Sequence, residues 1–169
     1  MSGSRQAAPD RIVRIDIDQG AIVRYSPEIE AERNKAVEDL LTGNRFHLVG
    51  TRALAGPYRV RLRRREERLV FDISTDKDRG KQAGQAKRVS LHLVPLRRVI
   101  HDYFAICESY FDATGFARPG RLEVIDAGRK ALHDEGATLL RDRLADKIEI
   151  DHETARRLFT LICVLHVRA

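Results

Sequence analysis

The 169-residue sequence contains only two cysteines, Cys107 and Cys163, and they do not form a closely spaced pair. Each lies within an apolar helical pattern, so neither a disulfide framework nor a cysteine metal motif is predicted. A buried structural thiol is favoured over a nucleophile at both positions. Because disulfide-rich frameworks belong to oxidising compartments, the cysteine content indicates a cytoplasmic protein.

Long apolar runs are also missing from the sequence. No stretch approaches about 18 consecutive apolar residues, so neither a membrane span nor a membrane partner is predicted. Residues 1–10 are small and polar and lack the apolar centre of a secretion signal, and we expect a disordered tail there. The sequence has no P-loop, no dinucleotide fingerprint and no Gly-x-Ser-x-Gly motif, and no cofactor is predicted.

The composition that is present suits a single domain, expected over residues 11–169. Hydrophobic residues make up 43% of the chain and charged residues 33%, with a formal net charge of +6. A basic chain favours polyanionic partners to some degree, although many basic proteins bind no nucleic acid.

The N-terminal half shows alternating patterns that are typical of strands. Strands are predicted at residues 11–17, 45–49, 58–64, 68–74 and 87–94, and a helix at 27–41. A glycine-containing loop separates the second and third of these predicted strands. Strands 58–64 and 68–74 form the clearest predicted hairpin. Residues 76–86 contain two glycines and no apolar periodicity, so we expect a mobile loop.

The C-terminal half is predicted to be helical. Residues 95–115 carry an apolar stripe at i, i+3, i+4 and i+7 spacing, and we expect the other helices to pack against it. Further helices are expected at 121–135, 137–146 and 152–167, with a break at Gly136, and the last should be the most buried. The order predicts an α+β fold: an antiparallel sheet of four or five strands from the N-terminal half, packed by four or five helices mostly from the C-terminal half.

Four stretches are similar to a known family. They are RLVFDI from Arg68, ICESYFDA from Ile106, DAGRKALHDEG from Asp126 and DHETARRLFTLICVLHVR from Asp151. With these motifs the chain resembles, from about Arg11 onward, the small bacterial proteins of uncharacterised protein family number 262, which is associated mainly with alphaproteobacteria. The resemblance implies a single cytoplasmic domain and names no chemistry.

One candidate site is a polar cluster in the helical half. Its members are Glu108, Asp126, Arg129, His133, Arg156 and His166. Asp126, Arg129 and His133 share one face of a predicted helix, and Glu108 is the expected partner of Arg156. The cluster is interpreted either as a pocket, in which a histidine moves a proton and arginines bind an anion, or as a buried network that fixes the packing of the helices. The structural network is the favoured interpretation.

A second candidate is a row of arginines on the predicted sheet. It comprises Arg59, Arg61, Arg63 and Arg65, with Arg68 and Arg88 on neighbouring strands. Successive side chains on one face of a strand are about 6.7 Å apart, so the row could follow a phosphate backbone. A solvated sheet face explains the same pattern and is favoured. No aromatic residue alternates with the arginines, which disfavours base stacking.

No catalytic constellation emerges from these patterns. His133-x-Glu135 lacks the Cys-x-x-Cys that completes the zinc-deaminase signature, and no metal site is predicted. The favoured function is therefore a cytoplasmic, non-catalytic binding or regulatory protein. The alternatives are a small enzyme that acts on an anionic substrate at the helical pocket, and sequence-independent binding of nucleic acid by the basic sheet face. The sequence leaves open whether the partner is a protein or a second copy of the chain, and it does not identify a ligand.

Overall fold

The computed structural model describes residues 10–18, 27–50, 54–75, 87–113 and 119–166, without the side chains of residues 28, 108–113, 119, 121 and 122. The strands are β1 (Ile12–Asp18), β2 (Phe46–Leu48), β3 (Tyr58–Arg65), β4 (Arg68–Thr75), β5 (Lys87–His92) and β6 (Ile148–Ile150). The helices are α1 (Pro27–Thr42), the 3-10 turn η2 (Val94–Leu96), α2 (Arg97–Ala113), α3 (Pro119–Leu144) and α4 (His152–Leu165). The α+β class is confirmed. The expected tail, apart from Asp10, and the expected loop at 76–86 lie outside the described residues.

The main sheet has the strand order β1-β3-β4-β5. The pairs β3–β4 and β4–β5 are antiparallel as expected, whereas β1 pairs with β3 in parallel, so the sheet is mixed. An alternating pattern specifies which face of a strand is buried but not the direction of the strand, which is why the sequence did not predict this pair. The side chain of Asn44, just after α1, accepts a hydrogen bond from the Ile12 amide at 2.7 Å and donates one to the Ile12 carbonyl at 2.9 Å, which fixes β1 beside the end of α1.

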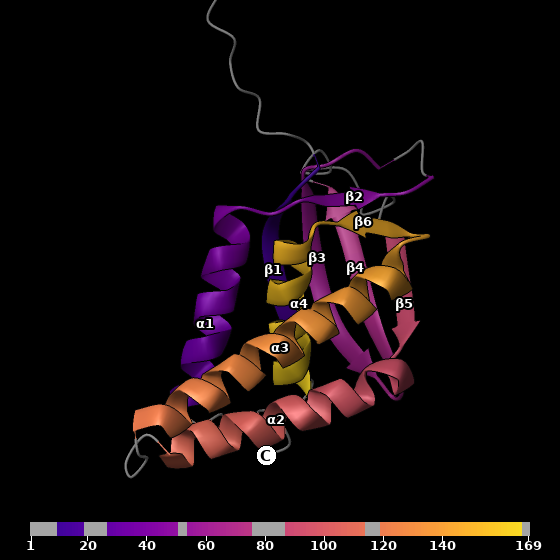
Figure 1. Ribbon diagram of the computed structural model, residues 1–169. Coiled ribbons are helices and arrows are strands. Elements are labelled where there is room, and N and C mark those ends of the chain that lie inside the picture. Colours follow the sequence, from indigo (N-terminus) through magenta and orange to yellow (C-terminus); the bar gives the residue numbers. More distant parts are fainter. Residues whose placement is uncertain (1–9, 19–26, 51–53, 76–86, 114–118, 167–169) are drawn as a thin grey trace, which may run out of the picture.

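The helices cover one face of the sheet, and α4 lies at the centre of the molecule (Figure 1). Nine of its residues are buried, which confirms the prediction that the last helix is the most enclosed. Leu158 and Ile162 of α4 share one hydrophobic core with Leu62 and Phe71 of the sheet. Helix α2, which the sequence suggested as the common partner, packs chiefly against α3. No helix in the described part of the chain has the length and apolar character needed to cross a membrane.

Two features of the C-terminal half differ from the prediction. Helix α3 is continuous through Gly136, where a break was expected, because a glycine costs an exposed helix only about 1 kcal/mol and packing can offset that cost. The ring of Phe159 on α4 occupies the space that a side chain at Gly136 would need. Strand β6 was not predicted at all. It pairs antiparallel with β2 through Phe46↔Ile150 and Leu48↔Ile148, and three residues are too few to show a period in the sequence.

Candidate functional site

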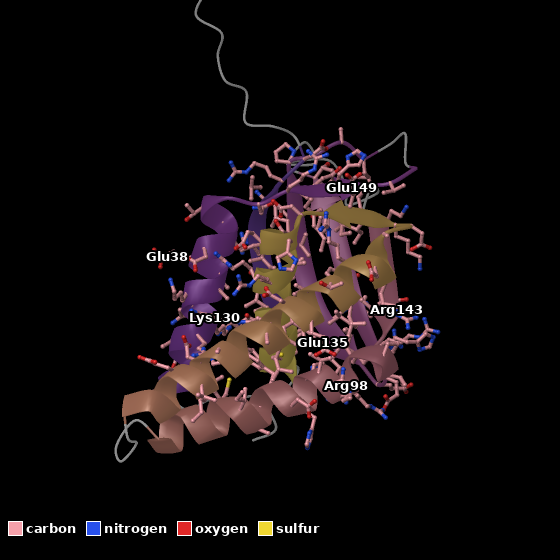
Figure 2. All side chains as sticks on the ribbon, in the orientation of Figure 1. Glu38, Arg98, Lys130, Glu135, Arg143 and Glu149 are labelled. Carbon is pink, nitrogen blue, oxygen red and sulfur yellow. The ribbon has the colours of Figure 1, made fainter. Side chains whose placement is uncertain are left out.

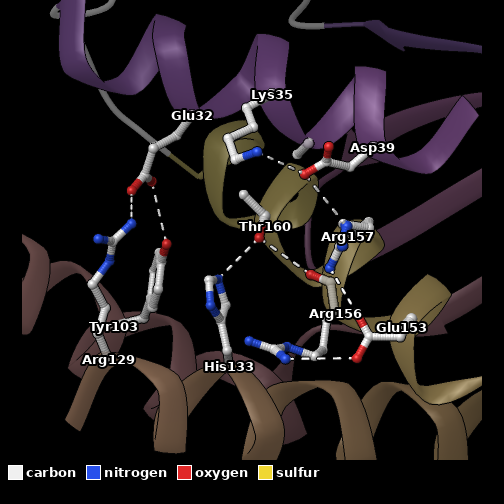
Figure 3. Close-up of a pocket in the computed structure, with 11 residues that line it drawn as sticks. Glu32, Lys35, Asp39, Tyr103, Arg129, His133, Glu153, Arg156, Arg157 and Thr160 are labelled. Atoms are coloured by element: carbon white, nitrogen blue, oxygen red, sulfur yellow. Dashed lines mark hydrogen bonds and ion pairs between the residues drawn. The ribbon is translucent and has the colours of Figure 1, made fainter. Parts of the chain in front are cut away.

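A cleft of about 370 Å³ opens between the helices (Figure 3). It is lined by Glu32, Lys35, Ala36 and Asp39 of α1, Tyr103 of α2, Arg129 and His133 of α3, and Glu153, Arg156, Arg157 and Thr160 of α4. Four of these side chains are cationic and three are carboxylates. The volume falls within the range of small-molecule sites in proteins, which is about 300–1,000 Å³.

One end of the cleft is built around the carboxylate of Glu32. Arg129 pairs with Oε1 of Glu32, and the hydroxyl of Tyr103 donates to Oε2 at 3.2 Å. Burial by itself lowers the pKa of the Arg129 guanidinium, but the charge of Glu32 together with the neighbouring Tyr103 and Cys107 more than offsets burial, so the pKa is raised. Burial and then the charge of Glu32 raise the pKa of Tyr103. Both groups therefore keep their protons, and the three side chains join α1, α2 and α3 at this end.

His133 stands in the middle of the cleft. Its Nε2 lies 2.9 Å from the hydroxyl oxygen of Thr160, and that hydroxyl donates to the carbonyl of Arg156 at 3.2 Å. Because a threonine hydroxyl has a single proton, Nε2 of His133 is the donor and Nδ1 is left as an acceptor. The imidazole lies against the ring of Tyr103, with ring centroids 4.7 Å apart and the ring planes tilted by 34°. Burial, followed by the charges of Arg156 and Arg129, lowers the pKa of His133 to about 4, so the ring is neutral at pH 7.

The other end of the cleft holds a chain of charges from α1 and α4. Lys35 lies 3.2 Å from Asp39, and Arg157 lies 3.0 Å from Glu153. Arg156 has longer contacts, 3.6 Å from its Nε to Asp134 and 3.7 Å from Nη1 to Glu153. Those distances exceed the range of a hydrogen bond. Its Nε, like that of Arg129, is buried without a hydrogen-bond partner among the described residues, but Arg156 also lacks a close carboxylate contact such as Glu32 gives Arg129.

Half of the predicted polar cluster meets in this cleft, namely Arg129, His133 and Arg156. Asp126 instead pairs along α3 with Lys130 at 3.3 Å, and their side chains are 44% and 69% exposed. His166 lies at the end of α4, where its Nδ1 is 2.7 Å from the carbonyl of Ile162, and it does not line the cleft. The side chain of Glu108 lies outside the described residues.

Sequence reasoning missed most of the α1 side of the cleft. Glu32 is four residues before Ala36 and eight before Leu40, both of which are buried, so it is a charged residue on the apolar stripe of α1. That spacing was the available signal. Tyr103 belongs to the apolar stripe predicted over residues 95–115, and its ring is buried, but its hydroxyl reaches Glu32. Thr160 has no polar neighbour in sequence that would indicate its bond to His133.

The row of arginines on the sheet has the predicted alternation. Tyr58, Val60 and Leu62 are buried against the core, while the intervening arginines lie on the other face. Several of these cations are paired: Arg61 with Asp18 at 2.6 Å, and Arg63 and Arg88 with Asp72 at 2.7 and 2.9 Å.

The remaining candidate groups show no arrangement for metal binding or nucleophilic chemistry. Within the described ranges, no three His, Cys, Asp or Glu side chains are placed to bind one metal ion. Cys107 and Cys163 are free and buried, and burial raises the pKa of both thiols. A thiol with a raised pKa is a poor nucleophile at neutral pH.

The fold and the site together define a small α+β protein whose helices enclose a charged cleft with a neutral histidine at its centre. The chain belongs to the uncharacterised protein family UPF0262, whose model matches residues 9–168. It is 46% identical over 159 residues to a UPF0262 protein of Rhodospirillum rubrum, with 94% of each chain covered. It is 49% identical to one of Jannaschia sp., with 94% of this chain and 98% of the relative covered, and 48% identical to one of Brucella canis, with 94% of each covered. No solved structure matches the chain.

Proposed function

We propose that this protein is a non-catalytic binding protein that holds a small anionic ligand in the cleft between its helices. The observation that carries the proposal is the state of Arg156, a partly buried guanidinium whose carboxylate neighbours lie 3.6 and 3.7 Å away and whose Nε has no hydrogen-bond partner among the described residues. A ligand carboxylate or phosphate would give this guanidinium the close, charge-assisted contacts that it lacks.

The neutral state of His133 supports an anion beside Arg156. Burial is the main cause of the low pKa of His133, and the charges of Arg156 and Arg129 lower it further because a charged imidazole would add to the positive charge there. A bound anion would offset the charges of Arg156 and Arg129 and would raise the pKa of His133. Anion binding and protonation of His133 should therefore be linked, with tighter binding at lower pH.

The same groups argue against the enzymatic alternative. A general base works best with a pKa near the working pH, and His133, with a pKa of about 4, is a weak base at neutral pH. The hydroxyls of Thr160 and Tyr103 are both engaged in hydrogen bonds within the cleft.

The free thiols of Cys107 and Cys163 support placing the protein in the cytoplasm.

The test is a titration of the 15N-labelled protein with inorganic phosphate and, separately, with malonate, followed by NMR. The proposal expects saturable shifts at Arg156, His133 and Thr160 with either anion, and at least tenfold weaker binding by Arg156→Met. Arg143→Met removes an exposed arginine from the last turn of α3 and should bind as the parent does. If neither anion gives saturable shifts at the cleft, or if Arg156→Met binds as tightly as the parent, the proposal is wrong.

A further inference from the structure

The outer face of the sheet, which points away from α1 and α4, carries charges in a defined order. The strand register places them in rows that run across neighbouring strands. From one end to the other these rows are Arg14–Arg59–Ser74, Asp16–Arg61–Asp72–Arg88, Asp18–Arg63–Val70–Ser90 and Arg65–Arg68–His92. Seven arginines and three aspartates thus lie on the described part of this face.

The middle of the face neutralises itself. Every aspartate belongs to the two central rows, and each is paired with an arginine, as in Arg61–Asp18 and Arg63–Asp72. The third aspartate, Asp16, accepts a hydrogen bond from Arg14 at 3.3 Å. The central part of the arginine row therefore has little positive charge to offer a partner, and the excess lies toward the ends.

The row beside the β3–β4 turn, unlike the two central rows, contains no carboxylate. Arg65 and Arg68 are direct cross-strand partners, and His92 is the partner of Arg68 on the next strand. All three are exposed. Arg68 donates to the hydroxyl of Ser90 at 3.2 Å, and no carboxylate in the described part of the chain pairs with it. Like charges placed directly opposite each other destabilise a sheet, so this row is an arrangement that an external anion would relieve.

The adjoining turn does not cancel this excess. It adds two carboxylates, Glu66 and Glu67, but also two further arginines in contact with it. Arg97 pairs with the carboxylate of Glu67, and Arg64 donates to the carbonyl of Glu66 at 3.1 Å. Arg64 and Arg97 balance the two glutamates, so this corner keeps the positive charge of Arg65 and Arg68.

We propose that the row Arg65–Arg68–His92 is a phosphate-backbone site through which the protein binds duplex nucleic acid without reading its sequence. Arginine favours phosphate because its planar guanidinium donates two parallel hydrogen bonds. Side chains on adjacent strands are about 4.8 Å apart, so the row presents its donors together to neighbouring oxygens of one backbone. The described outer face carries no Phe, Tyr or Trp, and stacking on aromatic rings is what retains single strands. A duplex, whose bases are already stacked, is therefore the partner that fits.

The experiment measures the binding of fluorescent 20-base-pair DNA and RNA duplexes, and of the corresponding single strands, by anisotropy at a series of salt concentrations. The charge-row variant is Arg65→Ser with Arg68→Ser. The matched control is Lys130→Ser with Arg143→Ser, which removes the same charge from α3 (Figure 2). Circular dichroism establishes that both variants stay folded.

The proposal expects duplex binding by the parent, with either DNA or RNA, and weaker binding by the charge-row variant. The slope of log K against log salt on DNA should fall by about 1.8, or 0.9 for each lost phosphate contact. The control should keep the slope of the parent. The proposal is overturned if the parent does not bind duplex at low salt, if both variants weaken binding equally, or if only single strands are bound. Phosphate binding in the cleft is measured separately at Arg156, so either result can fail alone.

Discussion

The aromatic ring of Phe159 on α4 lies directly against the backbone of Gly136 on α3. A Cβ atom built on Gly136 would be 2.4 Å from Cε2 of Phe159 and 2.5 Å from Cζ. Carbon atoms do not approach so closely without displacement. The absence of a side chain at Gly136 therefore sets how near α3 can come to α4, and with it the width of the cleft between them.

Gly136→Ala should destabilise the protein by about 1 to 2 kcal/mol. Overpacking a core costs about 1–3 kcal/mol, while the better helix propensity of alanine returns up to about 1 kcal/mol. Gly120→Ala is the matched control, because no atom of the described residues lies within 4 Å of a Cβ at that position of the same helix. It should be neutral or stabilising in urea unfolding. Equal stabilities for the two variants would show that α3 and α4 are not in tight contact at Gly136.

Glu32 and Arg129 should behave as a coupled pair in a double-mutant cycle. Their side chains are 23% and 21% exposed, so partial solvation reduces the cost of about 3–5 kcal/mol that breaking a fully buried pair carries. We expect a loss of about 1–3 kcal/mol for Glu32→Gln or Arg129→Met alone, and partial recovery in the double variant, which leaves no lone charge.

The control cycle uses Asp126 and Lys130, an exposed i,i+4 pair on the same helix as Arg129. Exposed helix pairs contribute about 0.3–0.5 kcal/mol, so Asp126→Asn with Lys130→Met should show coupling no larger than this. Coupling of the same small size between Glu32 and Arg129 would contradict a structural role for that pair.

Ile162→Ala should lower the free energy of unfolding by about 2–5 kcal/mol, the usual cost of truncating a large buried side chain. Ile162 is fully buried in α4 at the centre of the core. Val124 on α3 is 72% exposed, so Val124→Ala should change stability by less than about 0.5 kcal/mol. A loss below 1 kcal/mol for Ile162→Ala would contradict the central position of α4.

Stability should fall as the pH is lowered from about 6.5 to about 4, in part because of His133. Burial lowers the pKa of His133 in the folded protein to about 4, while the unfolded chain takes up this proton near pH 6.5. The unfolded state therefore binds more protons in this window, and the contribution is complete above pH 6.5 and lost as the pH falls through the folded pKa. The difference corresponds to about 3 kcal/mol at most.

Urea unfolding at several pH values checks this prediction. His133→Gln keeps a donor for Thr160 and should lose less stability than the parent between pH 6.5 and pH 4. His101, whose side chain is 84% exposed, provides the control, and His101→Gln should follow the parent. Parallel curves for the parent and His133→Gln would show that His133 is not held neutral in the fold.

The local elements were predictable because each has a strong pattern of its own. The alternation of Tyr58, Val60 and Leu62 predicted β3 and its buried face. The last helix was expected to begin at His152, and it does, capped by Asp151, which accepts from the Thr154 amide at 2.9 Å. The prediction that the helix breaks at Gly136 was wrong. Helix propensity ranks glycine as unfavourable within a helix, but Phe159, which is distant in sequence, packs directly against Gly136.

Of the candidate site, only residues on α3 and α4 could be predicted from the sequence. Arg129, His133 and Arg156 could be placed on helix faces by their spacing, but their partners come from other elements. Glu32 is 97 residues from Arg129, and no periodicity within one helix indicates which distant helix will face it. A charged residue on an apolar stripe shows that a partner exists, without identifying it.

The pairing of β2 with β6 has a consequence for how the protein is made. The backbone amide of Arg45, just before β2, donates to the hydroxyl of Thr154 in α4, 109 residues later. Helix α1 precedes β2 and helix α4 follows β6, so the two walls of the cleft that these helices form are synthesised far apart in time. At about 5–20 residues per second, roughly 5–20 seconds separate α1 from α4 during translation. Until α4 emerges, Leu62 and Phe71 on the inner face of the sheet lack their cover. A nascent chain therefore exposes part of the inner face of the sheet until α4 has been synthesised.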